Sequence, residues 1–249
     1  ISTSEPLTLQ GNNTAASADR LVNVGGDNTI AGKISPGPGG DKHGLRSDAG
    51  KLTVTGDIEG TASGNRFLYL RGSAAGEISG DILVGSGNTA LLKEGTGTWT
   101  LSGANTYTGA TTINQGTLQI GDGTLDGSLA ATSAISNNAT LIYNTFGSQT
   151  AANPISGTGS VIKKGFATLT LTGANTYSGG TTIDDATLVA GINGLNAGPI
   201  TLSAAGTLTF TGNNQVSTST LTGSGAILNN TANTIIITGD HTGFDGSFN

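Results

Sequence analysis

The chain has 249 residues, of which only 10% are charged, and its formal net charge is −6. This mild acidity argues against nucleic-acid binding, which needs a basic face, and against an anionic membrane surface as partner. Cysteine is absent, which excludes disulfides and thiol chemistry, and the longest apolar runs, such as 235–237, are too short to span a bilayer. The opening residues also lack the basic-then-apolar pattern of a signal peptide.

Short strand signals follow one another along the chain, and each ends at or near glycine, which accounts for 42 residues. Runs rich in threonine, aromatic and branched aliphatic residues predict strands at 53–55, 67–70, 98–101 and 207–210. No stretch keeps the 3.6-residue period of an amphipathic helix. The sequence therefore predicts an all-β protein.

The segment 35–50 interrupts this pattern, because its prolines and glycines at 36–40 are typical of a protruding loop. We expect this loop to be the best contact surface, since loops on a rigid scaffold often carry function. Its deletion should then leave the fold intact. The candidate contact residues are its charged and histidine side chains, namely Asp41, Lys42, His43 and Arg46.

Two copies of a long repeat, at 91–121 and 161–191, carry the strongest signal in the sequence. The copies are offset by 70 residues and are identical at about 17 of 30 aligned positions. Both contain Gly-Ala-Asn-Thr-Tyr, then a glycine, then Thr-Thr-Ile. A degenerate third copy covers 223–249. We therefore expect irregular N-terminal coils over 1–90 and a more regular repeat region over 91–249.

A shorter period lies inside the long one, in which a small or turn-forming residue precedes threonine and an apolar residue. The steps are roughly 19, 23, 28, 19, 20 and 27 residues between the following positions: Gly97, Gly116, Ala139, Ala167, Ala186, Gly206 and Asn233. A coil of about 20 residues has room for three short strands and their turns. Propeller blades need periods of about 40, and leucine-rich repeats need helical backs, for which the sequence gives no signal. We predict a right-handed parallel β-helix with about three coils per long repeat.

The interior of such a solenoid is formed by ladders of apolar residues, one from each coil. We expect the following residues at interior positions: Leu101, Leu118, Leu141, Leu171, Leu188, Leu208 and Ile237. Trp99 aligns with Leu169 of the second copy, so we assign it to the core as well.

The long copies resemble the passenger-associated transport repeat of bacterial autotransporters, over 93–121 and 163–191. The second copy departs from the first at Phe166 and Ala167, where the first has threonine and glycine. The resemblance implies a secreted or surface protein of a Gram-negative bacterium, exported by type V secretion through a C-terminal membrane barrel of the parent chain. It also implies that the repeat aids transport or folding. Many such passengers act in adhesion.

We expect a non-enzymatic surface stalk or adhesin-type module that has no catalytic residue, metal or cofactor. Host-cell, matrix or glycan surfaces are possible partners, as is self-association. One alternative is a passive transport or folding scaffold for a neighbouring passenger domain. Another is a polysaccharide-acting β-helix enzyme, which needs carboxylates from several coils in one groove. The adjacent acids Asp184 and Asp185 suggest it, but the first copy has Asn114 and Gln115 there, which indicates a solvated turn.

Four other patterns have a structural and a functional interpretation. His43 and His241 are the only histidines, too few for a zinc site, and we place both in surface loops. The stretch 121–127 is similar to calcium loops but lacks their spacing, so we interpret it as a turn. Tyr107 and Tyr177 either stack on sugars or staple one coil to the next.

The fourth pattern is a recurrent pair of threonines at alternate positions, which occurs at 53/55, 98/100, 168/170 and 207/209. Aligned on one flat face, such pairs can bind ice or crystalline carbohydrate. Threonine is also a good strand former at an outward position, and this is the interpretation that we favour.

Overall fold

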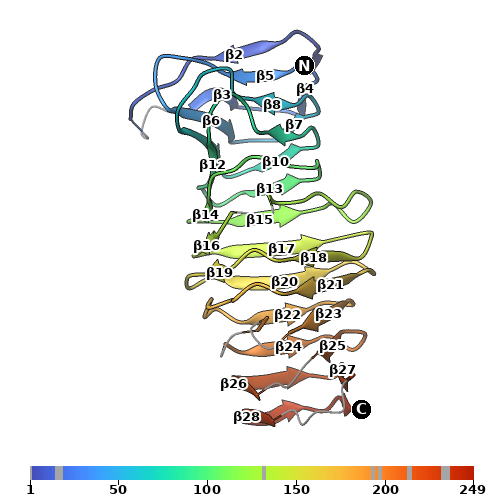
Figure 1. The fold of residues 1–249 in the computed structure, drawn as a ribbon. Helices are drawn as coiled ribbons and strands as arrows, with labels where there is room; N and C mark the ends of the chain where they lie inside the picture. Colours follow the sequence, from blue (N-terminus) through green and yellow to red (C-terminus); the bar gives the residue numbers. More distant parts are fainter. Residues whose placement is uncertain are drawn as a thin grey trace. The chain divides into compact units, whose positions relative to one another are not determined.

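The computed structural model of the chain is an all-β parallel β-solenoid, and Figure 1 shows short strands stacked coil upon coil within each part of the chain. The structure describes residues 2–14, 19–130, 133–191, 194–195, 198–211, 215–230 and 236–249. The chain forms two compact units, residues 1–133 and 134–249. Within the described residues, no helix is long and apolar enough to cross a membrane.

The first unit consists of three sheets of parallel strands. Its strands are β1 (Ser2–Thr3), β2 (Leu7–Leu9), β3 (Asp19–Asn23), β4 (Asn28–Ile30), β5 (Ile34–Pro36), β6 (Lys42–Ser47), β7 (Lys51–Val54), β8 (Ile58–Glu59), β9 (Arg66–Arg71), β10 (Ala75–Ile78), β11 (Ile82–Leu83), β12 (Thr89–Lys93), β13 (Thr98–Leu101), β14 (Thr111–Ile113) and β15 (Thr117–Ile120). The sheet orders are β1-β4-β7-β10-β13-β15, β2-β5-β8-β11 and β3-β6-β9-β12-β14. Each strand therefore lies beside its equivalent in the preceding and following coils.

The second unit repeats this architecture. Its strands are β16 (Ile135–Asn137), β17 (Thr140–Asn144), β18 (Gln149–Ala151), β19 (Ile155–Ser156), β20 (Ser160–Lys164), β21 (Thr168–Leu171), β22 (Thr181–Ile183), β23 (Thr187–Ala190), β24 (Ile200–Leu202), β25 (Thr207–Phe210), β26 (Gln215–Gly223), β27 (Ala226–Asn229), β28 (Ile236–Phe244) and β29 (Ser247–Phe248). The sheet orders are β17-β20-β22-β24-β26-β28, β18-β21-β23-β25-β27-β29 and β16-β19.

The register of the strands measures the length of a coil. Thr29 lies opposite Thr53, a coil of 24 residues (29 to 53), whereas Thr100 lies opposite Gln119, a coil of 19 (100 to 119). The parallel solenoid predicted from the repeats is thus confirmed. Its hand and the number of coils per long repeat stay predictions.

The core of each unit is made of apolar ladders, because alternate residues of every strand point inward. One ladder in the first unit runs through Ile30, Val54, Ile78, Leu101 and Ile120, and all five side chains are buried. Burial of each such side chain contributes about 1.5–3 kcal/mol. One coil alone buries too few such side chains to offset the conformational entropy that the chain loses on folding. The burial free energy is sufficient only when it is summed over many stacked coils.

Six of the seven residues expected in the interior are fully buried, and Ile237 is half-exposed. Leu188 stacks on Leu208 as expected. Leu101, however, stacks on Ile120, and Leu118 stacks on Trp99, so the two leucines belong to neighbouring ladders. The sequence repeat shows which residues point inward, whereas the register depends on the length of each turn.

The segment 35–50 is not a single protruding loop, as the sequence predicted, because half of it lies in strands β5 and β6. Residues Lys42–Ser47 form β6, which pairs with β3 on one side and β9 on the other. Pro36 ends β5, and the other prolines and glycines of the segment lie mainly in the turn between β5 and β6. Removal of 35–50 would leave β3 and β9 without the strand between them, so we now expect this deletion to disrupt the fold.

The boundary expected between 1–90 and 91–249 does not coincide with a break in the pairing. Strand β12 crosses residue 90 and pairs with β9 over five residues, from Thr89 opposite Arg66 to Lys93 opposite Leu70. The regular repeat therefore begins in the middle of a continuous stack.

Trp99 is the only tryptophan of the chain, and it lies in the core of the first unit with no exposed surface, as predicted. Its Nε1 donates a hydrogen bond to the carbonyl oxygen of Arg71 at 2.9 Å. The residue opposite it in the preceding coil is Gly76. A Cβ atom on Gly76 would lie 2.4 Å from the indole ring, so glycine is required here to make room for tryptophan.

We expect Gly76→Ala to destabilise the first unit by about 1–3 kcal/mol, because the added methyl group overpacks the core against the indole ring. In a Gly76→Ala/Trp99→Leu double variant, part of this loss should be recovered. Urea unfolding followed by circular dichroism measures both effects.

Gly25→Ala is the matched control, because a Cβ on Gly25 meets nothing within 4 Å. Its free energy of unfolding should stay within about 0.5 kcal/mol of the wild type. Equal losses from Gly25→Ala and Gly76→Ala would contradict the steric explanation.

Candidate functional site

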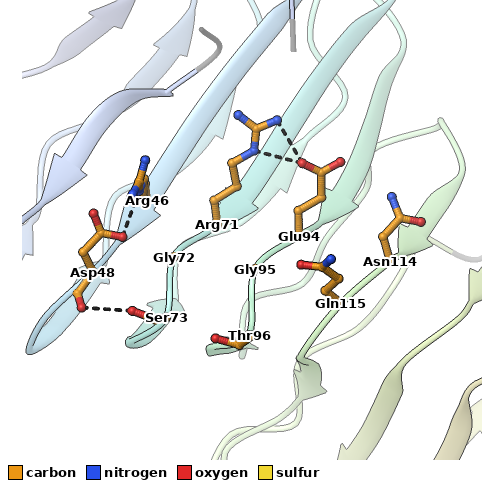
Figure 2. A pocket seen from close by; sticks show the side chains of 10 residues that line it. All are labelled: Arg46, Asp48, Arg71, Gly72, Ser73, Glu94, Gly95, Thr96, Asn114 and Gln115. Carbon is orange, nitrogen blue, oxygen red and sulfur yellow. Dashed lines mark hydrogen bonds and ion pairs between the residues drawn. The ribbon is translucent and has the colours of Figure 1, made fainter. Parts of the chain in front are cut away.

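A charged groove of about 650 Å³ lies along one corner of the first unit. It follows the ends of β6, β9, β12 and β14, where the chain turns towards the next strand of each coil, and Figure 2 shows its side chains. The lining residues are Arg46, Asp48, Arg71, Gly72, Ser73, Glu94, Gly95, Thr96, Asn114 and Gln115.

Stacking of coils brings the charges of the groove together from distant parts of the sequence. Arg46 lies opposite Arg71 in neighbouring strands. Arg71 contacts Glu94 through Nε and Nη2, at 3.0 and 2.9 Å, and also contacts Asp19 through Nη1 at 3.0 Å. Arg46 pairs with Asp48 at 2.8 Å, and its Nη1 lies 3.4 Å from Asp19. Asp19 thus bridges the two arginines.

This network joins four successive coils, those of β3, β6, β9 and β12, and its three carboxylates exceed its two guanidinium groups by one charge. The Arg71 side chain is 13% exposed and its guanidinium lies 4.2 Å from the centre of the Tyr69 ring. Isolated surface ion pairs contribute about 0–1 kcal/mol, but a partly buried network is more rigid. At the other end of the groove, the exposed Asn114 and Gln115 offer amide donors and acceptors. The groove therefore has the chemistry to hydrogen-bond a neutral polar ligand.

Of the four predicted contact residues, only Arg46 lines the groove. Asp41 and Lys42 pair with each other at 2.7 Å, and the Lys42 ammonium lies 5.5 Å from the centre of the Phe67 ring. His43 is fully buried, with Nε2 3.1 Å from the carbonyl oxygen of Gly37. Burial lowers the pKa of His43 below its ordinary value, which favours the neutral imidazole.

The prediction that both histidines lie in surface loops was wrong, because both belong to strands. His43 is in β6, and His241 is in β28, where its Nε2 lies 3.4 Å from the carbonyl oxygen of Ile237. Across the residues described, no group of three or more histidine, aspartate and glutamate side chains is placed to hold a metal ion.

The acid pair at 184–185 forms an ordinary turn, as expected. Asp184 lies 3.4 Å from the Lys164 ammonium. Asp185 has a positive φ of 51°, and its Oδ1 accepts a hydrogen bond from the Ser203 hydroxyl at 2.7 Å. The turn at 121–127 is also confirmed. Asp122 Oδ1 accepts hydrogen bonds from Thr124 and from the backbone of Leu125, and these bonds keep its pKa low despite the opposing effect of burial.

The paired threonines form only one short row, in which Thr187 lies between Thr168 and Thr207 in the second unit. The neighbouring row is interrupted, because Val189 lies between Thr170 and Thr209, and in the first unit Glu77 lies between Thr53 and Thr100. The pairs therefore do not build a wide threonine array, which favours the role of a strand former.

Each tyrosine of the repeat is buried in the core and has no exposed face for a sugar. Tyr107 has no exposed surface, and Tyr177 is 1% exposed. Their hydroxyl groups hydrogen-bond to those of Thr111 and Thr181, both at 2.6 Å. Burial raises the pKa of Tyr177 to about 12 and raises that of Tyr107 further, against the smaller opposing effect of these hydrogen bonds.

The asparagine before each tyrosine connects three successive coils. Asn105 Oδ1 accepts a hydrogen bond from the backbone of Ile82 in the preceding coil at 2.8 Å, and its Nδ2 donates to the carbonyl oxygen of Ser128 in the next coil at 2.6 Å. Asn175 makes equivalent bonds to Ile155 and Gly194, at 2.9 and 2.8 Å. The repeat block thus satisfies backbone groups on the unpaired sides of β11 and β19, the end strands of their sheets.

A buried lysine near the start of each copy closes a turn. Lys93 has no exposed surface, and its ammonium donates to the carbonyl oxygens of Glu94, Gly95 and Gln115 at 3.2, 2.7 and 3.0 Å. Burial lowers the pKa of Lys93 to about 8, so the ammonium form still predominates at neutral pH. Lys163 is buried in the same way and donates to Gly165 at 3.2 Å.

Comparison with known proteins identifies the repeats. Residues 91–120 and 161–190 match the passenger-associated transport repeat. A stretch of 97 residues, 38% of this chain, is 39% identical to the adhesin BmaC autotransporter of Brucella suis biovar 1 (strain 1330), and it spans only 3% of that protein's length. No solved structure matches the chain. The chain therefore carries two passenger-associated transport repeats within a parallel solenoid and has distant similarity to an autotransporter adhesin.

We expect Asn105→Ala to destabilise the protein by about 1–3 kcal/mol for each backbone group that it leaves buried without a partner. Asn114→Ala is the control, because Asn114 is exposed and its loss should change stability by less than about 0.5 kcal/mol. The measurement is the free energy of unfolding in urea. Similar values for the two variants would show that the asparagine of the repeat is dispensable.

We also expect stability to fall as the pH rises from about 10 to about 12. In this window the tyrosines of the unfolded chain, with pKa near 10, lose their protons, whereas buried Tyr107 and Tyr177 keep theirs. The folded state then binds more protons than the unfolded state, so raising the pH favours unfolding. Urea unfolding at pH 9, 10, 11 and 12 measures this slope.

The Tyr107→Phe/Tyr177→Phe variant should lose about 1 kcal/mol per missing hydrogen bond at pH 9 and show a shallower decline between pH 10 and 12. Other titrating groups are common to both proteins, so the difference between the two curves isolates the tyrosines. Parallel curves would refute this assignment.

Proposed function

We propose that this chain is a non-enzymatic segment of an autotransporter passenger that serves as a stalk or adhesin-type module at the bacterial surface. The observation that carries the proposal is the occurrence of two passenger-associated transport repeats within a stacked parallel solenoid. Similarity to a protein named as an adhesin supports it. In this proposal the parent chain supplies the membrane barrel for export, and the segment is secreted or remains attached to the cell surface.

The residue chemistry also supports a non-enzymatic role. Within the described part of the groove, Glu94 is held by Arg71 and Asp48 is held by Arg46. A polysaccharide-acting enzyme needs one carboxylate as a proton donor and another as a base or nucleophile. Acids that are neutralised by arginine are better suited to hold coils together. The exposed part of the groove, with Arg46, Asn114 and Gln115, is our candidate for an adhesive contact.

A second candidate function is a passive scaffold for transport or folding of a neighbouring passenger domain. It is favoured by the repeat residues Lys93, Asn105 and Tyr107, which are all buried. Lys93 and Asn105 bond to neighbouring coils, and Tyr107 bonds to Thr111 within its own coil. None of the three is placed to touch a ligand. In this view the repeat stabilises coils, and any binding activity lies elsewhere in the parent.

Surface display of the parent protein with and without this segment separates the two candidates, when secretion and binding to cells or matrix are scored in the same experiment. For an adhesive module, we expect deletion to abolish binding and leave secretion intact. Loss of secretion would instead favour the scaffold. If the deletion variant is still secreted and still binds, the segment has neither the adhesive nor the scaffold role.

A second variant, Arg46→Ala/Asn114→Ala/Gln115→Ala, removes the exposed part of the groove and leaves the Arg71 ion pairs in place. If the groove is the adhesive contact, this variant should be displayed normally and bind less. Unchanged binding would place the contact outside the groove.

A further inference from the structure

Two strongly exposed phenylalanines lie at one corner of the second unit. Phe146 is 71% exposed and Phe166 is 96% exposed. They follow β17 and β20, in which Asn144 lies opposite Lys164. The turns stack as well, since a Cβ atom on Gly165 would lie 2.6 Å from the carbonyl oxygen of Thr145. The two phenylalanines therefore occupy the same place in successive coils, and we call this pair the aromatic corner.

Folding does not require an aromatic residue at this corner. The residue of the first repeat that aligns with Phe166 is Thr96, which is also exposed. The two copies share their buried lysine, asparagine and tyrosine, so the structural roles of the repeat are met without phenylalanine. Two exposed aromatic rings on adjacent coils leave apolar surface in contact with water, which is unfavourable unless a ligand covers it.

The surroundings of the aromatic corner are polar but electrically balanced. The Lys164 ammonium lies 3.4 Å from an Asp184 carboxylate oxygen, and the half-buried Asn144 is neutral. The chain as a whole carries a net charge of −6. This charge pattern does not favour an anionic polymer such as a nucleic acid or a sulfated glycan.

The size of the aromatic corner argues against a protein partner. A stable protein interface buries about 800 Å² on each side, whereas one aromatic side chain buries about 150–250 Å². Two phenylalanines therefore fall well short of the area that a second copy of this chain needs. A sugar ring, in contrast, is matched in size by a single phenyl ring, because the C–H face of the sugar packs flat on the aromatic face.

We propose that the aromatic corner binds a neutral, extended glycan, with consecutive sugars on Phe146 and Phe166. This inference rests on the adhesive function proposed above and names its ligand class. Coils repeat at about 4.8 Å along the stack, which is close to the length of one hexose unit in an extended chain. Asn144 and Lys164, on the same coils, supply hydrogen-bond donors to the sugar hydroxyl groups.

The test is a titration of the purified chain with cellohexaose and with chitohexaose, followed by calorimetry and by NMR of the phenylalanine rings. For at least one of the two oligosaccharides, we expect shifts of the Phe146 and Phe166 signals in the wild type. Affinity should drop at least tenfold in Phe146→Ser/Phe166→Thr, in which threonine is the residue of the first repeat. Absence of binding by the wild type, or equal binding by the variant, would overturn the proposal.

Two controls keep the test specific. Leu125→Thr removes another exposed apolar residue, from the first unit, and should leave affinity unchanged. Ser73→Phe/Thr96→Phe places two phenylalanines at the equivalent corner of the first unit and should add a second site. Self-association of the wild type is tested by sedimentation at several protein concentrations. If the wild type self-associates and Phe146→Ser/Phe166→Thr does not, a second copy of the chain covers the aromatic corner, and the glycan proposal is overturned. These assays use purified protein and test only glycan binding at the aromatic corner. A negative result would therefore leave the adhesive function open, because the display experiment tests that function separately.

Discussion

The structure depends on one constraint, the in-register stacking of parallel strands at the spacing of about 4.8 Å set by their backbone hydrogen bonds. Every side chain then lies directly above and below its equivalents in neighbouring coils. Apolar residues form ladders such as the one from Ile30 to Ile120. A large residue needs a small residue opposite it in the neighbouring coil, which is why Gly76 lies opposite Trp99. Buried polar groups must also find partners within one coil step.

The repeats solve this last problem at the corners, where strand pairing stops. Asn105 and Asn175 bond to backbone groups above and below, and Lys93 and Lys163 close turns through carbonyl oxygens. The outer surface of a corner has no such task and is free to differ between copies. In the first unit it carries the ion pairs of Arg71, and in the second it carries exposed Phe166. The contacts proposed above at Phe146, Phe166, Asn114 and Gln115 are thus separate from the buried lysine, asparagine and tyrosine of the repeat.

The repeats in the sequence were sufficient to predict the parallel solenoid, the coil length and the buried place of Trp99, since these follow from spacing and residue type alone. The groove could not be predicted. Arg71 meets Asp19 across 52 residues, and only the register of several irregular turns brings them together. His43 was misplaced because proline and glycine at 36–40 conceal the strand that follows. The sequence shows that Phe166 replaces Thr96 of the first copy, but it does not show that both positions are exposed, because exposure depends on how the turns stack.

Coil lengths differ while the ladders stay aligned, and this difference has an evolutionary consequence. A coil of 24 residues and one of 19 present their strands in the same register, so the surplus lies in the turns. Insertions at corners leave the core unchanged, whereas a single residue added within a strand would turn its inward side chains outward. Such a protein can lengthen by duplication of whole coils and diversify by drift at its corners, with the two processes largely independent.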